Sequence, residues 1–203
     1  MHLDIDQNTD EWALARSGKV TGSAIAKVMA NYGKAFGEPA KKLAVDIAIE
    51  QMTGKPIGSS YSNEHMERGH EEEPIARMAY EDHYFCTVEN GGFFDNGDTG
   101  CSPDGIVSDG LVEIKSAIPS IHYQRIKRDS FDPAYKWQLL FNLRECGKEW
   151  IDFVSYCSTF TPEKKLFIHR VYAGEHIQAF EQIEERLSEF MGMVTLIKGD
   201  IAE

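Results

Sequence analysis

Two carboxylates and a lysine lie close together in the middle of the chain. Asp104 belongs to a Ser-Pro-Asp-Gly run, and Glu113 and Lys115 belong to a Glu-Ile-Lys run shortly after it. Between the two runs, Asp109-Gly110 is a strong signal for a hairpin turn, which would fold the two arms together. Alternation along the second arm places Glu113 and Lys115 on one face and turns Ile114 toward the core. The spacing therefore predicts that the carboxylates and the ammonium converge.

This set of groups suits a divalent cation. The carboxylates of Asp104 and Glu113 and the backbone carbonyl between Glu113 and Lys115 are the hard oxygen ligands that Mg²⁺ prefers, and Mn²⁺ is a plausible substitute. Two such ions roughly 3.5–4 Å apart can stabilise the attacking and leaving oxygens of a phosphodiester. Lys115 can orient or deprotonate the attacking water and offset charge on the phosphate. The residues thus favour metal-dependent phosphodiester hydrolysis.

The Glu-x-Lys triplet by itself is a weak signal. A second triplet, Glu163-Lys164-Lys165, lacks the upstream Pro-Asp-Gly run and has a charged middle residue, so we interpret it as a solvated loop. For the first triplet an alternative stays open. Asp104 could simply form a turn, and Glu113 could pair with Lys115 across a surface strand.

The charge balance does not favour nucleic acid as a partner. The 203-residue chain has a formal net charge of −12, whereas phosphate contacts normally come from a basic surface. Basic side chains do gather locally, at Lys41-Lys42 and at Arg125-x-Lys127-Arg128. A nuclease site also needs acidic metal ligands. A nucleic-acid partner must therefore be argued from the candidate site, against the evidence of the overall charge.

The composition predicts a soluble protein inside the cell. No apolar run approaches the roughly 20 residues that a membrane span needs, and the acidic residues 1–6 contain no apolar signal core. The four cysteines are scattered without a C-x-x-C pair, which excludes zinc-ribbon and thioredoxin motifs and indicates free thiols.

We expect a single domain, residues 1–203, with an α/β architecture of helices around a central mixed sheet. Periodicity and capping residues predict helices at residues 11–16, 24–30, 38–52, 63–82, 121–128, 133–146 and 175–197. Strands are predicted at residues 84–88, 92–94, 99–107, 111–116, 150–158 and 166–171. Pro74 should kink or divide the fourth helix, on which Ile75, Met78 and Ala79 form one apolar stripe. Trp12 is expected in the core.

These motifs together resemble the PD-(D/E)xK nuclease superfamily, and specifically the lambda-exonuclease-like phage recombination nucleases of the alkaline exonuclease and viral recombinase type. The resemblance implies the restriction-endonuclease-like nuclease core of that superfamily. It extends over most of the chain and is carried by five blocks in the right order. The blocks are Glu11-Trp12-x3-Arg16-x-Gly18-x-Val20-Thr21-x-Ser23, Gly69-x3-Glu73-x3-Arg77, Ser102-Pro103-Asp104-Gly105, Glu113-Ile114-Lys115 and Tyr135-x2-Gln138.

The resemblance implies roles for the central residues. Asp104, Glu113 and the carbonyl of Ile114 would bind one metal ion. Glu73, together with Asp104, would help to bind the second. Lys115 would be the catalytic lysine.

Further roles follow from the same resemblance. Arg16 and Ser23 would hold a terminal 5′-phosphate, which a guanidinium and a hydroxyl near a helix start both suit. Gln138 and Tyr135 would lie beside the site, with Gln138 helping to fix Lys115 or water. Met66 would fall where the family places an apolar residue that splits the end base pair.

Each of these roles has an ordinary alternative. Arg16 could pair with Glu11 or Asp10 on the surface. Glu73 lies in a run of three glutamates, which is typical of a solvated helix face, and the bracketing motif residues favour it over its neighbours. Met66 could be a gap-filling methionine on a helix.

The function that the resemblance implies is a processive 5′-to-3′ exonuclease. It would digest one strand of linear double-stranded DNA in the cytoplasm of a bacterial host and leave 3′ single-stranded tails for phage recombination. A ring-shaped homotrimer around DNA and a single-strand annealing protein as partner are also implied. An endonuclease of the same superfamily and a catalytically inactive DNA-binding or interaction module remain the alternatives. The Arg16 and Ser23 block argues against the first, and the complete ligand set argues against the second.

Overall fold

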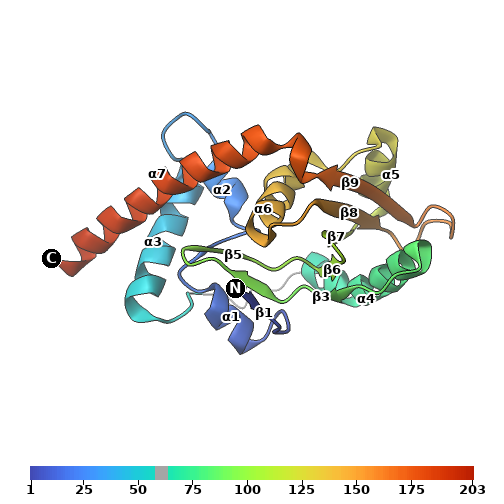
Figure 1. Cartoon of the computed structure of the whole chain (residues 1–203), viewed down its shortest axis with the longest axis horizontal. Helices are drawn as coiled ribbons and strands as arrows, with labels where there is room; N and C mark the ends of the chain where they lie inside the picture. The colour runs from blue at the N-terminus through green and yellow to red at the C-terminus, as the bar shows by residue number, and fades with distance from the viewer. Residues whose placement is uncertain (58–63) are drawn as a thin grey trace.

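The chain folds into two small β-sheets with helices packed around them (Figure 1). The computed structural model describes the backbone of residues 1–57 and 64–203, and the side chains of residues 1–57 and 71–203. Its helices are α1 (Asp10–Arg16), α2 (Ile25–Met29), α3 (Glu38–Thr53), α4 (Glu64–Tyr84), α5 (Pro119–Arg128), α6 (Lys136–Cys146) and α7 (Ile177–Ala202), with 3₁₀ turns at Pro133–Tyr135 and Ala173–Glu175. Its strands are β1 (His2–Leu3), β2 (Val20–Thr21), β3 (Glu89–Asn90), β4 (Phe93–Asp95), β5 (Thr99–Cys101), β6 (Gly105–Val107), β7 (Gly110–Ser116), β8 (Trp150–Tyr156) and β9 (Leu166–Tyr172).

The larger sheet has the order β3-β6-β7-β8-β9 and is mixed, because only β7 and β8 run parallel. β6 and β7 form the predicted hairpin. Val107 lies opposite Gly110, so the turn residues are Ser108 and Asp109, one position earlier than predicted. Strand β7, which carries Glu113, is the middle strand of the sheet and is buried along most of its length.

The smaller sheet has the order β1-β4-β5-β2 and provides the second half of the structure. The predicted strand 99–107 is in fact two strands, since β5 belongs to this sheet and β6 to the larger one. Between them the chain crosses from one sheet to the other at residues 102–104. Pro103 lies in this crossing, where a residue without a backbone N–H cannot continue a ladder. Asp104 therefore stands at the junction of the two sheets.

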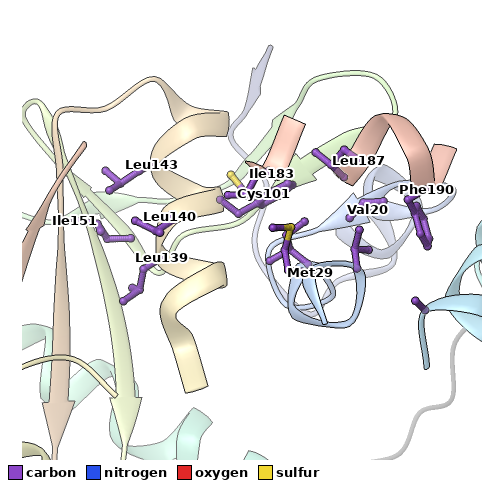
Figure 2. Packing of buried hydrophobic residues seen from close by; sticks show 14 of the residues in the cluster. Val20, Met29, Cys101, Leu139, Leu140, Leu143, Ile151, Ile183, Leu187 and Phe190 are labelled. Atoms are coloured by element: carbon purple, nitrogen blue, oxygen red, sulfur yellow. The ribbon is translucent and has the colours of Figure 1, made fainter. Parts of the chain in front are cut away.

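The main core lies where helices α2, α3, α6 and α7 meet the two sheets. Figure 2 shows α6 at its centre, with Leu139 and Leu140 directed toward Ile151 of β8. On the other side of α6, the core continues through residues of β2, α2, β5 and α7. These include Val20, Met29, Cys101, Ile183, Leu187 and Phe190. This packing fixes α6 against the sheet that carries the central carboxylate.

Helix α4 differs from its prediction in two ways. It continues through Pro74 as one helix, so of the two predicted effects, a kink or a division, the division does not occur. The apolar stripe is also not the buried face as a whole, because Ile75 is 50% and Met78 63% exposed, whereas Ala76 and Tyr80 are buried. The small Ala76 and the polar tip of Tyr80 make the contact with the sheet, so apolar size was a misleading guide to the buried face.

The strand predicted at residues 84–88 is also wrong. Helix α4 continues to Tyr84, the backbone turns at Phe85 with φ of 51°, and only Glu89–Asn90 pairs as a strand. The other predicted helices lie close to the observed ones, and the predicted strands at residues 150–158 and 166–171 are confirmed as β8 and β9.

All four cysteines are free thiols, as predicted. Cys101 Sγ lies 3.3 Å from Cys146 Sγ, which is a contact between two thiols and not a disulfide bond. Within residues 1–57 and 64–203, no helix combines the length and the apolar character needed to cross a bilayer.

A buried polar network joins α4 to the larger sheet. Asp152 on β8 is fully buried and accepts a hydrogen bond of 2.7 Å from the Tyr80 hydroxyl on α4. Arg170 on β9 donates to both carboxylate oxygens of Asp152 at 2.8 Å, and its guanidinium lies 3.5 Å from the Trp150 ring centroid. The charge of Asp152 is therefore compensated where no water reaches it.

Replacing Arg170 by leucine should destabilise the protein markedly, because Asp152 would keep a buried charge without its partner. We expect Arg170→Leu to lower the free energy of unfolding by about 3–5 kcal/mol in urea titrations. The control is Lys41→Leu, which removes an exposed ion pair with Glu38 and should cost at most about 1 kcal/mol. Equal small losses in both variants would contradict this role of Arg170.

Candidate active site

The hairpin β6–β7 brings the two central carboxylates together, as the sequence predicts. Asp104 directly precedes β6, and its Oδ2 accepts a hydrogen bond of 2.6 Å from the backbone N–H of Ile114. On the neighbouring strand, Lys115 Nζ lies 2.5 Å from Glu113 Oε1, while the Ile114 side chain is turned inward. Glu113 is only 1% exposed, so the alternative of an ion pair on a surface strand does not hold.

Three side-chain donors hold the Glu113 carboxylate. Besides Lys115, Gln138 Nε2 donates to Oε1 at 2.6 Å, and Asn142 Nδ2 donates to Oε2 at 3.0 Å. Gln138 thus contacts Glu113, whereas the motif predicts that it fixes Lys115 or a water molecule. Asn142 was not predicted from the sequence. Its signal was present, because Gln138 and Asn142 are four residues apart and share one face of a helix that is otherwise rich in apolar residues.

Helix α4 brings Glu73 to the same region. The neighbouring Glu71 is exposed, and Glu72 Oε1 accepts a hydrogen bond from Ser158, so neither competes with Glu73. Arg77, one turn after Glu73, lies 3.8 Å from Glu73 Oε1 and donates to the backbone carbonyl of Asp104. Arg77 therefore ties α4 to the junction at Asp104, a contact that no local pattern in the sequence could predict.

The crowded carboxylates have unusual pKa values. Burial, together with the negative charge of Asp104, raises the pKa of Glu113 to about 7, against the opposing effect of Lys115. Burial and Asp104 likewise raise the pKa of Glu73 to about 7, against Arg77 and Lys115. A cation bound between these groups would relieve their mutual repulsion.

The Lys115 ammonium is held in its charged form. Burial opposes the charge, but Glu113 and Asp104 outweigh burial and raise the Lys115 pKa above its ordinary value. Tyr135 lies beside it, with its ring centroid 5.3 Å from Nζ, as the motif predicts. The buried guanidinium of Arg125 lies 5.5 Å from the same ring centroid, and its Nη1 donates a hydrogen bond of 3.4 Å to the Lys115 backbone carbonyl. In this environment the Lys115 side chain carries a positive charge beside the two carboxylates.

Arg16 points toward Ser23 and not toward the acidic start of its own helix. Its Nη2 lies 3.2 Å from Ser23 Oγ and 3.4 Å from Thr21 Oγ1. In the described part of the chain, Arg16 forms no ion pair with Glu11 or Asp10, so that alternative is not observed. Burial lowers the Arg16 pKa to about 10, which leaves the guanidinium charged at neutral pH.

Trp12 belongs to the site, so the prediction that it lies in the core is wrong. Its indole N–H donates a hydrogen bond of 2.7 Å to Ser102 Oγ, and its ring lies 3.9 Å from the guanidinium carbon of Arg16. A half-buried indole needs a partner for its N–H, and Ser102, just before Asp104, provides it. Trp12 thereby connects helix α1 to the Ser-Pro-Asp-Gly run.

One cavity of about 170 Å³ connects these two groups of residues. It is lined by Gln7, Trp12, Arg16, Gly22, Ser23, Ser102, Asp104, Glu113, Lys115, Gln138 and Asn142. Glu73 and Tyr135 are not among its lining residues, although each lies close to one that is. The predicted phosphate-binding pair, Arg16 and Ser23, and the predicted metal ligands Asp104 and Glu113 thus line the same cavity.

The donors in this region could hold a divalent cation. Asp104, Glu113 and Glu73 supply carboxylate oxygens, which suit a hard cation. Within the part of the chain that the structure describes, no group of three or more His, Cys, Asp or Glu side chains is clustered ready to bind a metal together. Glu113 instead faces its three donors, so a cation would bind by exchanging places with Lys115 at that carboxylate.

Met66, predicted to contact DNA, lies in α4 in the stretch whose side chains are outside the described residues.

The chain belongs to the family of YqaJ-like viral recombinase domains, whose model matches residues 11–149. An alkaline exonuclease from Laribacter hongkongensis (LHK-Exo) is 30% identical, with a TM-score of 0.80, over 96% of this chain and 98% of that one. The structure of LHK-Exo in complex with dAMP matches equally well. No curated protein matches the chain.

A more distant structure shares the fold. A phage-related exonuclease from Haemophilus somnus 129PT is 13% identical, with a TM-score of 0.68, and the match covers 90% of this chain and 96% of that one. The predicted architecture, mixed β-structure flanked by helices with the PD-(D/E)xK nuclease core, is confirmed. The predicted central sheet is divided into two.

Cation binding should release protons from this site. With the pKa values of Glu73 and Glu113 both at about 7, each is roughly half protonated at pH 7, and binding a divalent cation should displace about one proton in total. The apparent affinity for Mg²⁺ should therefore rise with pH between about 6 and 8, because protons compete less. Calorimetry in two buffers of different ionisation enthalpy measures the proton count. An affinity independent of pH would contradict the coupling.

Proposed function

We propose that this protein is a metal-dependent 5′-to-3′ exonuclease that digests one strand of linear double-stranded DNA and leaves 3′ tails for recombination. The single observation that carries the proposal is the shared cavity. A charged guanidinium beside a hydroxyl, at Arg16 and Ser23, opens onto the same space as Asp104, Glu113 and Lys115. A terminal phosphate held by the first pair would present the next phosphodiester to the second group.

The relatives support DNA as the substrate. The chain belongs to a family of viral recombinase domains, and the solved structures that it resembles include exonucleases. LHK-Exo binds dAMP, a deoxynucleoside monophosphate of the kind that an exonuclease releases from DNA. We therefore assign DNA hydrolysis from an end.

Asp104, Glu113 and the carbonyl of Ile114 would hold one Mg²⁺, and Glu73 would help to hold a second, with Mn²⁺ as a substitute. The bound metal supplies an activated water and neutralises charge on the phosphate. Lys115, held in its charged form, lies where negative charge develops during hydrolysis and stabilises it. Gln138 orients Glu113, and Tyr135 packs against the Lys115 ammonium.

Arg16 and Ser23 give the reaction its direction. A phosphate at the end of a strand carries more charge than one within it, and a guanidinium with a hydroxyl beside it matches that group. Trp12 keeps the Arg16 guanidinium in place through their stacking contact. Met66 would meet the end base pair of the duplex.

A ring-shaped homotrimer in the bacterial cytoplasm, enclosing the duplex, would reconcile this function with the net charge of −12. Basic groups would line the channel while the exterior stays acidic. Enclosure of the duplex would also make digestion processive. The 3′ tails would pass to a single-strand annealing protein.

Linear and closed circular DNA distinguish this function from its alternatives. We expect Mg²⁺-dependent digestion of end-labelled linear duplex, none in EDTA, and no cleavage of closed circles. Lys115→Met should lower the rate about 10²- to 10³-fold, with folding and DNA binding retained. The matched control is Lys165→Met, in the second Glu-x-Lys triplet, which should keep full activity. Cleaved circles would indicate an endonuclease, and inert wild-type protein would indicate a binding module.

Removing the Arg16 guanidinium should erase the preference for 5′-phosphorylated ends. We expect Arg16→Ala to reduce the rate ratio between 5′-phosphate and 5′-hydroxyl ends by about 10- to 100-fold, the value of one or two charge-assisted hydrogen bonds. Arg128→Ala, at the exposed end of α5, removes the same charge and should leave the ratio unchanged. An unchanged ratio in Arg16→Ala would show that Arg16 does not recognise the 5′-phosphate.

A further inference from the structure

Asn142 has an unusual set of contacts for a buried amide. Its side chain is 1% exposed, and its Nδ2 donates a hydrogen bond of 3.0 Å to Glu113 Oε2. Its Oδ1 is buried and has no hydrogen-bond partner among the described residues. An unsatisfied buried acceptor costs stability, and such groups are uncommon in folded proteins. The amide is therefore oriented with Nδ2 toward Glu113, although Oδ1 then has no partner among these residues.

The surrounding backbone is shaped to admit this orientation. A Cβ atom built on Gly22 would lie 2.4 Å from Asn142 Oδ1. Gly22 does not adopt a positive φ. A glycine is therefore needed at this position because there is no room for a side chain, and not because of the backbone conformation. A side chain at Gly22 would force the Asn142 amide to rotate and would withdraw Nδ2 from Glu113.

Glu113 needs this contact because its two oxygens are held unequally. Oε1 accepts hydrogen bonds from both Lys115 and Gln138, whereas among the described side chains Asn142 is the donor to Oε2. The last torsion of a glutamate is broad and is not fixed by staggering. Without the donor at Oε2, the plane of the carboxylate could swivel about its contacts at Oε1.

We infer that Asn142 is a positioning residue, which sets the orientation of the Glu113 carboxylate for cation binding and depends on the open space at Gly22. The inference rests on the proposed function, since it assigns Glu113 to a cation. An asparagine serves here better than a carboxylate, because it offers a donor to Glu113 without adding negative charge. It also remains neutral at every pH at which the protein is folded.

The test is the affinity for Mn²⁺ measured by calorimetry without DNA. Asn142→Ala should weaken binding about 10- to 100-fold, as is usual when a partner of a metal ligand is lost. Gly22→Ala should weaken binding in the same direction. In the Asn142→Ala background the same change at Gly22 should have little further effect, because the atom it displaces is gone.

Glu145→Gln is the matched control for a purely structural effect. Glu145 is also buried on α6 and accepts hydrogen bonds from Asn96 and Thr99, but it does not contact Glu113. This variant should change the melting temperature and leave Mn²⁺ affinity unchanged. The inference is overturned if folded Asn142→Ala binds Mn²⁺ like the wild type, or if the effects at Gly22 and Asn142 simply add. A wild type that binds no divalent cation would overturn the proposed function as well.

Discussion

A carboxylate removed from water must be compensated by nearby donors, and this requirement at Glu113 organises the site. Glu113 is 1% exposed, so its charge would be very costly without partners. Lys115, Gln138 and Asn142 supply them, and they come from the same strand and from helix α6. The compensation is incomplete, because burial and the charge of Asp104 keep the pKa of Glu113 raised to about 7. A cation bound at this carboxylate would therefore compete with both a proton and the Lys115 ammonium.

The rest of the fold serves to keep these groups in register. Strand β7 is the middle strand of its sheet, and its pairing with its neighbours fixes the position of Glu113 along the strand and the face of the sheet on which it lies. The crossing between the two sheets places Asp104 against the Ile114 amide, and Arg77 fastens α4 to the same point. The network around Asp152 holds α4 about one turn further along, at Tyr80. The site is therefore assembled from separate elements whose only common feature is that they meet at this junction.

Sequence reasoning succeeded where the relevant contacts are local. The hairpin and the alternation of Glu113 with Lys115 follow from turn chemistry and strand geometry, and both are confirmed. It failed where long-range contacts decide. Trp12 bonds to a residue far along the chain, so its type alone suggested the core. Helix α4 buries the small Ala76 in place of larger apolar residues, because the sheet and not the helix determines which face fits.

The central claim is that this junction seats a divalent cation, and anomalous diffraction from crystals soaked in Mn²⁺ tests it most directly. The account predicts a peak bounded by Asp104, Glu113 and the carbonyl of Ile114, with the Lys115 ammonium moved away from Glu113. A second, weaker peak toward Glu73 would complete the proposed pair. Crystals that show no peak at this position, with Glu113 still bonded to Lys115 at saturating Mn²⁺, would contradict the account.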